Sequence, residues 1–484
     1  MRLCFNRVSS RALLMTGALF CCATAGFAQT TEPSYAPSTP GQSIPGTQGA
    51  SSFGSSVPTK PVPGVIPISL QEAIDRGLKQ NLGLLLSSSD VRAARGERWE
   101  QLSALLPHVT ASPYVDVSKI NLQQLGITLP GVNLPSSVGP FSYFDARVAV
   151  TQSLFDWKSI NSERAASQNL KSTEYTSRDA RDLVVLAVGF TYLQAIANEA
   201  RVETAEAQVQ TAQALYDQAT DQVTAGTSPA IDGLRAKVEL QTRQQQLIQA
   251  KNDLAIQKLT VARVIGLAAG QEFELTDKSL YQPFDGISVD DALKRAYASR
   301  SDYQAAVSAV RAAEFTRKAA VAGYFPSVSF NANYGTGSSH PSMATEVFDV
   351  RGTLSIPIFT GGSVHGDVLQ ADARLTQSHE RMESLRAQID ADVRTALLNL
   401  QSYADQVNVA RSNIDLAEQA LTQSRDRFAA GVADTVEVVQ SQETVASAHE
   451  QYISSLYNYN YAKISLARVL GTAEQGVKEY FKGK

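Results

Sequence analysis

Residues 106–115 read LPHVTASPYV and residues 325–334 read FPSVSFNANY, and these two stretches decide the fold. Each has a proline at its second position, Pro107 or Pro326. The residue before a proline avoids the α region, so a preceding helix is expected to end there. Beyond the proline, apolar and polar side chains alternate, which is the period of a β-strand with two unlike faces. Each stretch therefore predicts a helix that gives way to a strand, and in the first the composition predicts this helix over residues 70–106.

A second alternating stretch follows each of these strands, at Phe144–Gln152 and at Phe348–Ile356, and Pro357 lies at the junction after the last one. Two strand pairs are therefore expected. A strand of about ten residues with one apolar and one polar face suits a tilted transmembrane β-strand. It suits a half-buried soluble hairpin equally well. The expected strands cover about 108–118, 143–154, 327–336 and 346–358.

The unit that contains these strands occurs twice. ISLQEAIDRGL at 68–78 corresponds to ISVDDALKRAY at 287–297, and ARVIG at 262–266 corresponds to ARVLG at 467–471. The first copy carries about 15 more residues, near residues 121–140. A repeat of this length indicates duplication of a whole unit rather than a solenoid. We expect the first copy at 68–275, the second at 276–472 and a C-terminal tail at 473–484.

Each copy also predicts a very long helix that reverses at a tight turn. These helices are expected over about 159–222 and about 363–428, each on the order of 95–100 Å long at 1.5 Å per residue. Apolar residues form strict heptads from Val202 to Val223, and the second copy repeats them. A sustained 3.5-residue period indicates supercoiled packing. Alanine is frequent in the seams, and the other faces are neutral and polar, which suits a wall with water on both sides. A simple helical hairpin explains the heptads equally well.

The N-terminus predicts export. Three arginines precede an apolar run that ends in the small residues Gly26 and Ala28, which is the form of a secretory signal peptide over residues 1–28. All three cysteines lie within this segment, so the exported chain has none. Lipidation of Cys22 is the alternative, and the bulky residues before it disfavour that modification. Residues 29–67 are rich in Pro, Ser, Gly and Thr and are expected to form a flexible linker without a fold.

Composition argues against several classes of protein. With 43% hydrophobic and 19% charged residues and a net charge of −4, the chain is neither a disordered acidic tail nor a basic nucleic-acid binder. Outside the N-terminus we expect no run of about 18 apolar residues that would cross a bilayer as a helix. The five histidines follow no metal-ligand spacing, and no phosphate-binding loop or nucleophile elbow is evident. We expect no catalysis, no metal and no cofactor.

Four amphipathic strands are too few to close a barrel, because the smallest transmembrane barrels have about eight. An open sheet in lipid would leave costly unpaired backbone groups at its edges. If these strands enter a membrane, several chains must share one barrel. Together with the export signal, they indicate a bacterial outer membrane, with the helices projecting into the periplasm.

The order and duplication of these elements resemble the TolC-like outer-membrane efflux proteins over nearly all of residues 67–472. The resemblance rests on the duplicated unit, IPIFTGG at 356–362, and the tip turns VTAGTSPAID at 223–232 and FAAGVADTVE at 428–437. It implies an α+β membrane protein, in which three chains share a 12-stranded β-barrel on a 12-helix periplasmic α-barrel. It also implies an equatorial girdle around the helices, formed by residues 267–286 and the C-terminal segment.

The resemblance further assigns roles to residues of the two tips. The turns would be the surface on which a periplasmic membrane-fusion adaptor docks. In a homotrimer, acidic residues after the turns would form charged rings at the periplasmic entrance, and such rings select ions. The alternative is that these acids only stabilise positive helix N-termini. The turn residues are Gly226, Thr227, Gly431 and Val432, and the gate candidates are Asp232, Phe428 and Glu437.

These expectations describe a passive export duct in the outer membrane. It would work with an adaptor and, through it, an inner-membrane pump of the RND or ABC type, in a tripartite efflux or type I secretion system. Its surroundings would be outer-membrane lipid, and no nucleic acid is expected. The alternative is a soluble periplasmic coiled-coil adaptor or scaffold, which would explain the helical hairpins but not the strand pairs.

Overall fold

The computed structural model describes residues 54–61, 63–122, 124, 135–277, 281–284, 286–339 and 343–480. All of them belong to one unit, Gly49–Lys484. The expected signal peptide, Cys22 and most of the expected linker lie outside the described residues.

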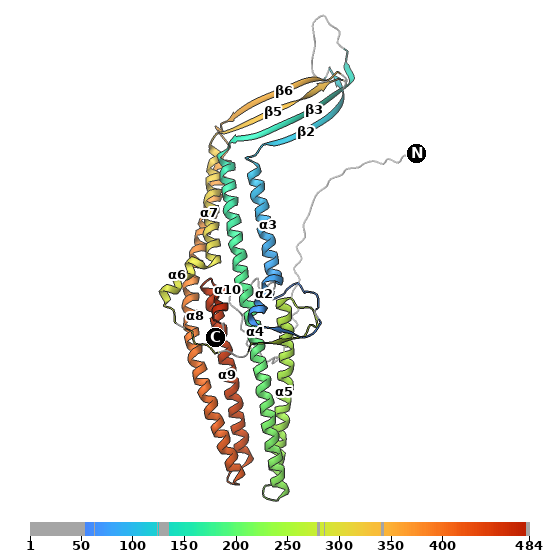
Figure 1. Cartoon of the computed structure of the whole chain (residues 1–484). Helices are drawn as coiled ribbons and strands as arrows, with labels where there is room; N and C mark the ends of the chain where they lie inside the picture. Colours follow the sequence, from blue (N-terminus) through green and yellow to red (C-terminus); the bar gives the residue numbers. More distant parts are fainter. Residues whose placement is uncertain are drawn as a thin grey trace, which may run out of the picture. The chain divides into compact units, whose positions relative to one another are not determined.

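One four-stranded antiparallel sheet lies at one end of the helices of this unit (Figure 1). The strand order is β2-β3-β5-β6, so β2 and β6 are the edges. Within the described chain, neither edge strand pairs with another strand along its outer side. The strands are β2 (His108–Asn121), β3 (Ser137–Phe155), β5 (Ser327–Ser338) and β6 (Thr345–Ser355).

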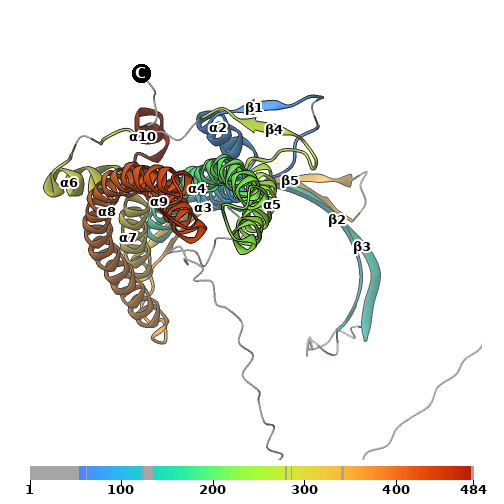
Figure 2. The ribbon, with the colours of Figure 1, turned by 90° about the horizontal axis from the view of Figure 1, so that it is seen from below.

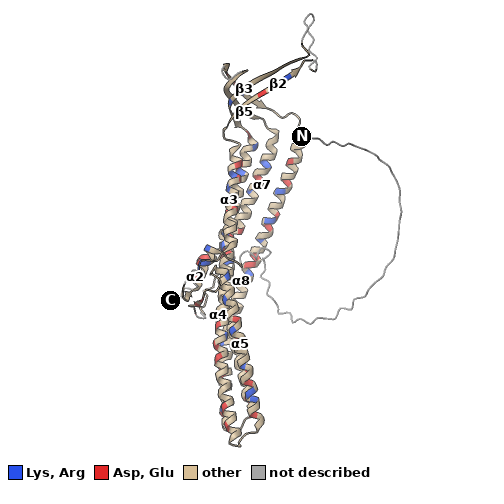
Figure 3. Cartoon of the chain, turned by 90° about the vertical axis from the view of Figure 1, so that its right-hand side faces the viewer, with Lys and Arg blue, Asp and Glu red and all other residues tan. Residues whose placement is uncertain are grey.

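The sheet has no core of its own. Val109, Phe348 and Val350 are 64%, 74% and 64% exposed, and none of the described sheet residues belongs to the three hydrophobic clusters of the unit. Charged side chains are few on the strands (Figure 3). A soluble antiparallel sheet normally packs one face on a core. This sheet leaves its apolar residues without cover from the same chain.

The first hairpin is longer than the second. β2 pairs with β3 out to Asn121 and Ser137, whereas β5 pairs with β3 only as far as Phe144. The outer part of the first hairpin therefore extends beyond its neighbour, where the first copy has its additional residues. In contrast, β6 ends at Ser355, short of the expected 358, because Pro357 cannot donate a ladder hydrogen bond.

Two antiparallel helix pairs continue from the sheet as a wall. Figure 2 shows them as an arc in the order α5-α4-α9-α8. Asp156 begins the first long helix, because its carboxylate accepts a hydrogen bond of 2.9 Å from the Lys158 N–H. Alanines of the heptad seams, such as Ala212 and Ala417, are buried, which lets the axes approach closely. The helices are α4 (Trp157–Thr224), α5 (Ala230–Ile265), α8 (Ser363–Ala429) and α9 (Thr435–Val469).

The helix before each strand pair is broken at the same position of the repeat, so the expectation of one continuous helix over 70–106 is wrong. Asn81 and Arg300 both adopt extended backbone, with ψ of 129° and 121°. The Asn81 side chain accepts a bond of 2.9 Å from the Gly83 N–H and so begins the next helix. Arg300 instead pairs with Asp302 at 2.6 Å. The resulting helices are α2 (Leu70–Gln80), α3 (Leu82–Ser103), α6 (Val289–Ser299) and α7 (Ser301–Val321), and η1 (Ala322–Tyr324) follows α7.

The end of the expected linker is part of the fold, so an unstructured segment up to residue 67 is a wrong expectation. Val57 donates its N–H to the Gln80 carbonyl at 2.8 Å, and Thr59 donates to the Gly266 carbonyl at 2.9 Å. Composition could not predict this backbone pairing, because backbone hydrogen bonds do not depend on side-chain type. β1 (Ile66–Ile68) then pairs in parallel with β4 (Phe273–Leu275) beside the helices, and α10 (Ala473–Tyr480) ends the described chain.

One described helix, α4, is long and apolar enough to cross a membrane by length and composition, which differs from the expectation that no such stretch exists. Its apolar residues Val184, Val185 and Val188 are fully buried. They pack in a cluster with residues of α2, α5, α9 and α10. The core of the helical wall accounts for this apolar stretch.

Matched glycines of the second copy give a test of this packing. Gly431 and Gly471 have φ of 71° and 73°, so alanine at either position is strained by roughly 1–2 kcal/mol. An added Cβ meets open space at Gly431, but at Gly471 it would lie 2.6 Å from the Arg300 backbone nitrogen. Gly471→Ala should therefore destabilise the chain by about 2 kcal/mol more than Gly431→Ala. Thermal unfolding of both variants measures this, and equal losses would contradict the described packing.

Candidate functional site at the helical tips and the sheet–helix junction

Both helix pairs reverse direction through the same turn. In the first, the Thr227 N–H bonds to the Gln222 carbonyl at 2.9 Å, and in the second the Val432 N–H bonds to the Arg427 carbonyl at 3.0 Å. A glycine in the left-handed conformation precedes each donor, with φ of 71° in both. This is the Schellman arrangement that ends a helix. The predicted tip residues thus form two equivalent, exposed turns.

The two acidic gate candidates are each paired with an arginine of the same chain. The carboxylate of Asp232, a residue only 7% exposed, lies 3.3 Å from Arg235 on the same helix. The Glu437 carboxylate lies 3.1 Å from Arg427, which belongs to the helix on the other side of the turn. Asp434 caps α9 by accepting a bond of 3.1 Å from the Glu437 N–H. The Glu437 carboxylate thus lies both near the N-terminus of α9 and beside the guanidinium of Arg427.

Phe428 does not lie with these charges. Its side chain is 3% exposed and belongs to a cluster that joins the two helix pairs near their tips. In this position it packs the first pair on the second, and its burial favours a packing role over a gate role. The cluster consists of Leu215, Ala219, Ala236, Leu421, Phe428 and Val438.

Exposed aromatic side chains mark the junction between the sheet and the helices. Phe155 ends β3 and stacks on Trp157 at the start of α4, with ring centroids 6.4 Å apart. After β6, Ile358 and Phe359 are 96% and 89% exposed. Amphipathic aromatic rings favour the headgroup level of a bilayer. The same junction contains three prolines next to the strand ends, Pro107, Pro326 and Pro357.

Ion pairs join the two helix pairs along the wall. Arg201 of α4 meets Glu450 of α9 at 2.8 Å, and Arg468 of α9 meets Asp179 of α4 at 2.8 Å. Arg243 of α5 is the most buried of these arginines, at 3% exposed.

Two carboxylates surround Arg243. Glu239 of the same helix lies at 2.6 Å and Glu443 of α9 at 2.7 Å. The sequence pattern missed this contact between helices. The i,i+4 spacing of Glu239 and Arg243 is a visible signal for a pair on one helix, but Glu443 is 200 residues away.

Two further groups have shifted pKa values in the middle of the wall. Burial raises the pKa of Asp182 to about 6, against the opposing effect of Arg468. Burial also lowers the pKa of Lys463 to about 8, and its ammonium donates to the Gln282 carbonyl at 3.2 Å. Among the described residues, no group of three or more His, Cys, Asp and Glu could hold a metal ion.

Removal of the Arg243 guanidinium should weaken the wall. Arg243→Met leaves Glu239, 8% exposed, without its cation, and breaking a buried pair costs about 3 kcal/mol or more. The matched control is Lys251→Met on the same helix, because Lys251 and its partner Glu206 are 55% and 47% exposed and such an exposed pair should contribute less than about 1 kcal/mol. Thermal unfolding distinguishes the two variants. Equal melting temperatures would mean that Arg243 does not support the packing of α5 on α9.

Comparison with known proteins agrees with this architecture. The chain matches the model of the family described as outer membrane efflux protein over residues 73–267 and 292–472. The outer membrane protein TolC of Escherichia coli K12 is 24% identical over 353 residues, which cover 68% of this chain and 70% of TolC. The pyoverdine export outer membrane protein OpmQ of Pseudomonas aeruginosa is 23% identical over 410 residues, 82% of this chain and 85% of OpmQ.

Solved structures show the same fold. The outer membrane protein VceC of Vibrio cholerae superposes with a TM-score of 0.73 at 18% identity, over 83% of this chain and 96% of VceC. CusC superposes with a TM-score of 0.72 at 21% identity, over 86% of this chain and 98% of CusC. Because the family match spans well over half of the sequence, the chain belongs to the outer membrane efflux protein family and is a TolC-like protein of the outer membrane.

Proposed function

We propose that this protein is the outer-membrane duct of a tripartite efflux or type I secretion system. Three copies would share one β-barrel of 12 strands, continued by an α-barrel of 12 helices in the periplasm. The duct is passive, and an inner-membrane pump supplies the energy through an adaptor. The observation that carries this proposal is that the sheet and the helical wall both end on uncovered edges.

The sheet edges favour closure with further copies. β2 and β6 each leave one row of backbone N–H and C=O groups without a strand partner in the described chain. The exposed apolar face suits lipid, but the unpaired edges are unfavourable there for a single copy, because each unpaired group costs several kcal/mol. If β6 of one copy pairs with β2 of the next, the edges disappear.

The outermost helices of the arc favour the same closure. On α8, Leu398, Val409 and Leu416 are 69%, 60% and 61% exposed and repeat at heptad positions. On α5, a matching exposed stripe contains Leu234 and Ile248. A seam between α5 of one copy and α8 of the next would bury both stripes, and each such side chain gains about 1.5–3 kcal/mol when buried. The full α5 stripe is Ile231, Leu234, Val238, Ile248, Ile256 and Leu259.

The exposed aromatic junction supports the placement of the sheet in the membrane. Trp157 would lie at the interface with the apolar rings of Phe155 and Phe359 close to it, so that the strands are in lipid and the helices in water. A soluble scaffold would gain nothing from such a band. The tip turns, with Thr227 and Val432 exposed, then lie farthest from the outer membrane. They are the surface that we assign to the adaptor.

Introduction of a negative charge into the stripes tests the assembly. Ile248→Glu or Leu416→Glu would place a carboxylate in the α5–α8 seam, so each should convert trimers to monomers in native mass spectrometry of the detergent-solubilised chain. Val432→Glu is the control, because Val432 is 66% exposed but lies in a tip turn. Trimers in all three variants would contradict the proposed seam. Wild-type protein that is monomeric and needs no detergent would favour the soluble scaffold.

The Arg427–Glu437 pair gives a test of the periplasmic entrance. If three copies bring these side chains around a narrow pore, Glu437→Gln should lower the cation-to-anion permeability ratio and Arg427→Gln should raise it, each by about twofold or more. Reversal potentials in planar bilayers under a KCl gradient measure the ratio. The two variants remove opposite charges from one pair, so each is the control of the other. No change in either would mean that the pair does not line the conducting path.

A further inference from the structure

A pocket of about 360 Å³ lies between α4 and α9, where the two copies of the repeat meet. α2 and α10 border one end of it, and Figure 2 places these helices on the convex side of the arc. In the proposed assembly this is the outer surface of the wall rather than the lumen. From Tyr192 to Thr204, two lining residues of α4, the helical rise is about 18 Å, so the pocket is elongated.

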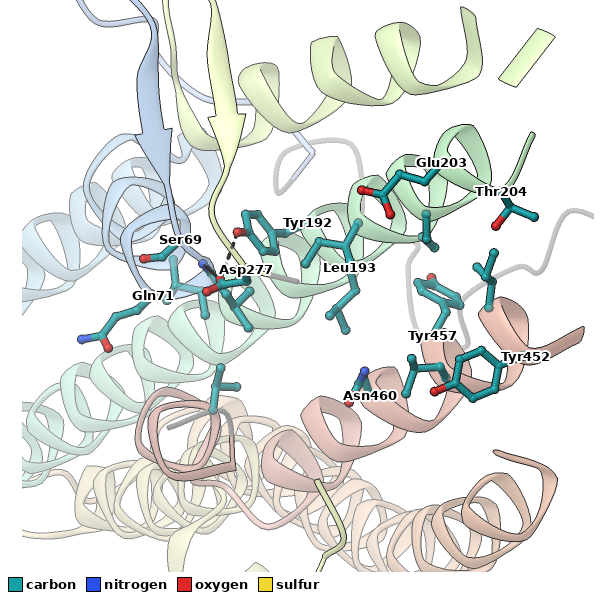
Figure 4. A pocket seen from close by; sticks show the side chains of 18 of the residues that line it. Ser69, Gln71, Tyr192, Leu193, Glu203, Thr204, Asp277, Tyr452, Tyr457 and Asn460 are labelled. Carbon is teal, nitrogen blue, oxygen red and sulfur yellow. Dashed lines mark hydrogen bonds between the residues drawn. The ribbon is translucent and has the colours of Figure 1, made fainter. Parts of the chain in front are cut away.

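The walls of the pocket are largely apolar. Leu193 of α4 and Ile453 and Leu456 of α9 line it and are 6%, 9% and 4% exposed. Tyr452 and Tyr457 add aromatic surface, and Figure 4 shows both on the helix that faces Leu193. An elongated apolar slot of this volume is within the range of small-molecule sites.

Two polar groups in these walls lack a partner. Asn460 is 4% exposed, and no described residue bonds to its Oδ1 atom or to the buried hydroxyl of Tyr457. Burial and the neighbouring Tyr461 raise the pKa of Tyr457, against the effect of Arg201, so the hydroxyl stays neutral. A buried polar group without a hydrogen bond costs free energy. A guest with hydrogen-bonding groups would remove this cost.

Charges at the pocket favour a cationic guest. Glu203 lines one end, and Figure 4 shows it there beside Thr204. No ion pair joins Glu203 to another described residue, and its side chain is exposed. Asp277 lines the opposite end and accepts hydrogen bonds from the Tyr192 hydroxyl at 3.0 Å and the Leu70 N–H at 2.6 Å.

The remaining charges around the pocket are compensated. Glu474 pairs with Arg181 at 3.0 Å, and His449 lies 3.4 Å from Glu418. Arg201, whose charge lowers the pKa of Tyr457, forms an ion pair with Glu450. The groups that line the pocket thus carry a surplus of negative charge, and no uncompensated cation among the described residues lines it.

We propose that this pocket is a binding site for an amphipathic organic amine. The ammonium lies near Glu203 and the faces of Tyr452 and Tyr457, which attract a cation. The apolar body lies between Leu193 and Leu456, and a hydroxyl or amide of the guest reaches Asn460. Because α4 and α9 belong to different halves of the duplication, the guest bridges the two helix pairs from outside the duct.

Propranolol is a suitable probe of the apolar and cationic parts of the site, since it combines a naphthyl ring with a secondary ammonium. Equilibrium dialysis of the full chain at a fixed non-ionic detergent concentration separates protein binding from partition into micelles. We expect saturable binding of one molecule per chain. 1-Naphthoxyacetate, which has the same ring and a carboxylate, should bind at least about fivefold more weakly because of the negative surplus.

Variants locate the site. Ala200→Leu on α4 fills the pocket and should weaken binding more than about tenfold, whereas Glu203→Gln should weaken it about two- to fivefold. Glu206→Gln is the matched control, because Glu206 pairs with Lys251 and does not line the pocket. It should bind like the wild type.

Propranolol binding that Ala200→Leu leaves unchanged would overturn the proposal, as would equal affinity for the naphthoxyacetate. Thermal unfolding of Ala200→Leu shows whether the variant is folded. Glu203→Gln is a second test of the site that changes only an exposed side chain. Because binding is counted per chain, it can also be measured on the Ile248→Glu variant, which we expect to be monomeric. Failure of the site is therefore separable from failure of the proposed assembly.

Discussion

Backbone hydrogen bonding at the edges of the sheet is the constraint on which the rest of the molecule depends. In hydrocarbon, an N–H or C=O group has no water to bond to, and β2 and β6 each present a full row of such groups. Each of the four strands is joined to a helix by a short segment, which in the case of β3 and α4 is Asp156 alone. Whatever closes the sheet must also set the spacing of the helices. In the proposed assembly the helical wall would close together with the sheet, and the exposed stripes on α5 and α8 have the composition that such a closure requires.

Within one chain, apolar clusters and ion pairs together connect the two halves of the wall. The apolar clusters lie near the middle and near the tips. Between them, Arg243 and Arg201 reach from the first helix pair to glutamates of α9. Ion pairs of this kind contribute little net stability but are costly to break on one side. Their main effect is to fix the register of one helix pair on the other, whereas their net contribution to the free energy of unfolding is small.

Much of this fold could be predicted from the sequence, because period and order carry it. The alternation after Pro107 and Pro326, the heptads and the turns at Gly226 and Gly431 are all local patterns. The break at Asn81 could not be predicted in this way, because composition there is that of a helix and the cap depends on one side chain. The equivalent Arg300 carries no capping signal at all, and its ion partner Asp392 lies on another helix.

The features missed at the site have the same origin. The role of Glu443 at Arg243, the burial of Phe428 and the pocket beside Asn460 arise from contacts between segments far apart in the sequence. Backbone pairing of residues from Val57 onward is likewise invisible in a Pro- and Ser-rich stretch. Local patterns define the elements, whereas these contacts are created only when the two copies of the repeat pack together.

The unequal hairpins have a consequence for symmetry. The two tip turns of one chain are nearly identical in backbone, with the same φ at both glycines, whereas the β2–β3 hairpin reaches well past β5. Around a ring of three chains, the helical end would present six nearly equivalent turns, close to sixfold symmetry. The opposite rim would alternate tall and short hairpins and would be strictly threefold. The surface facing the cell exterior and the surface facing the periplasm would therefore have different rotational symmetry, although one duplicated sequence forms both. A molecule that binds from outside and one that binds from the periplasm would encounter this difference.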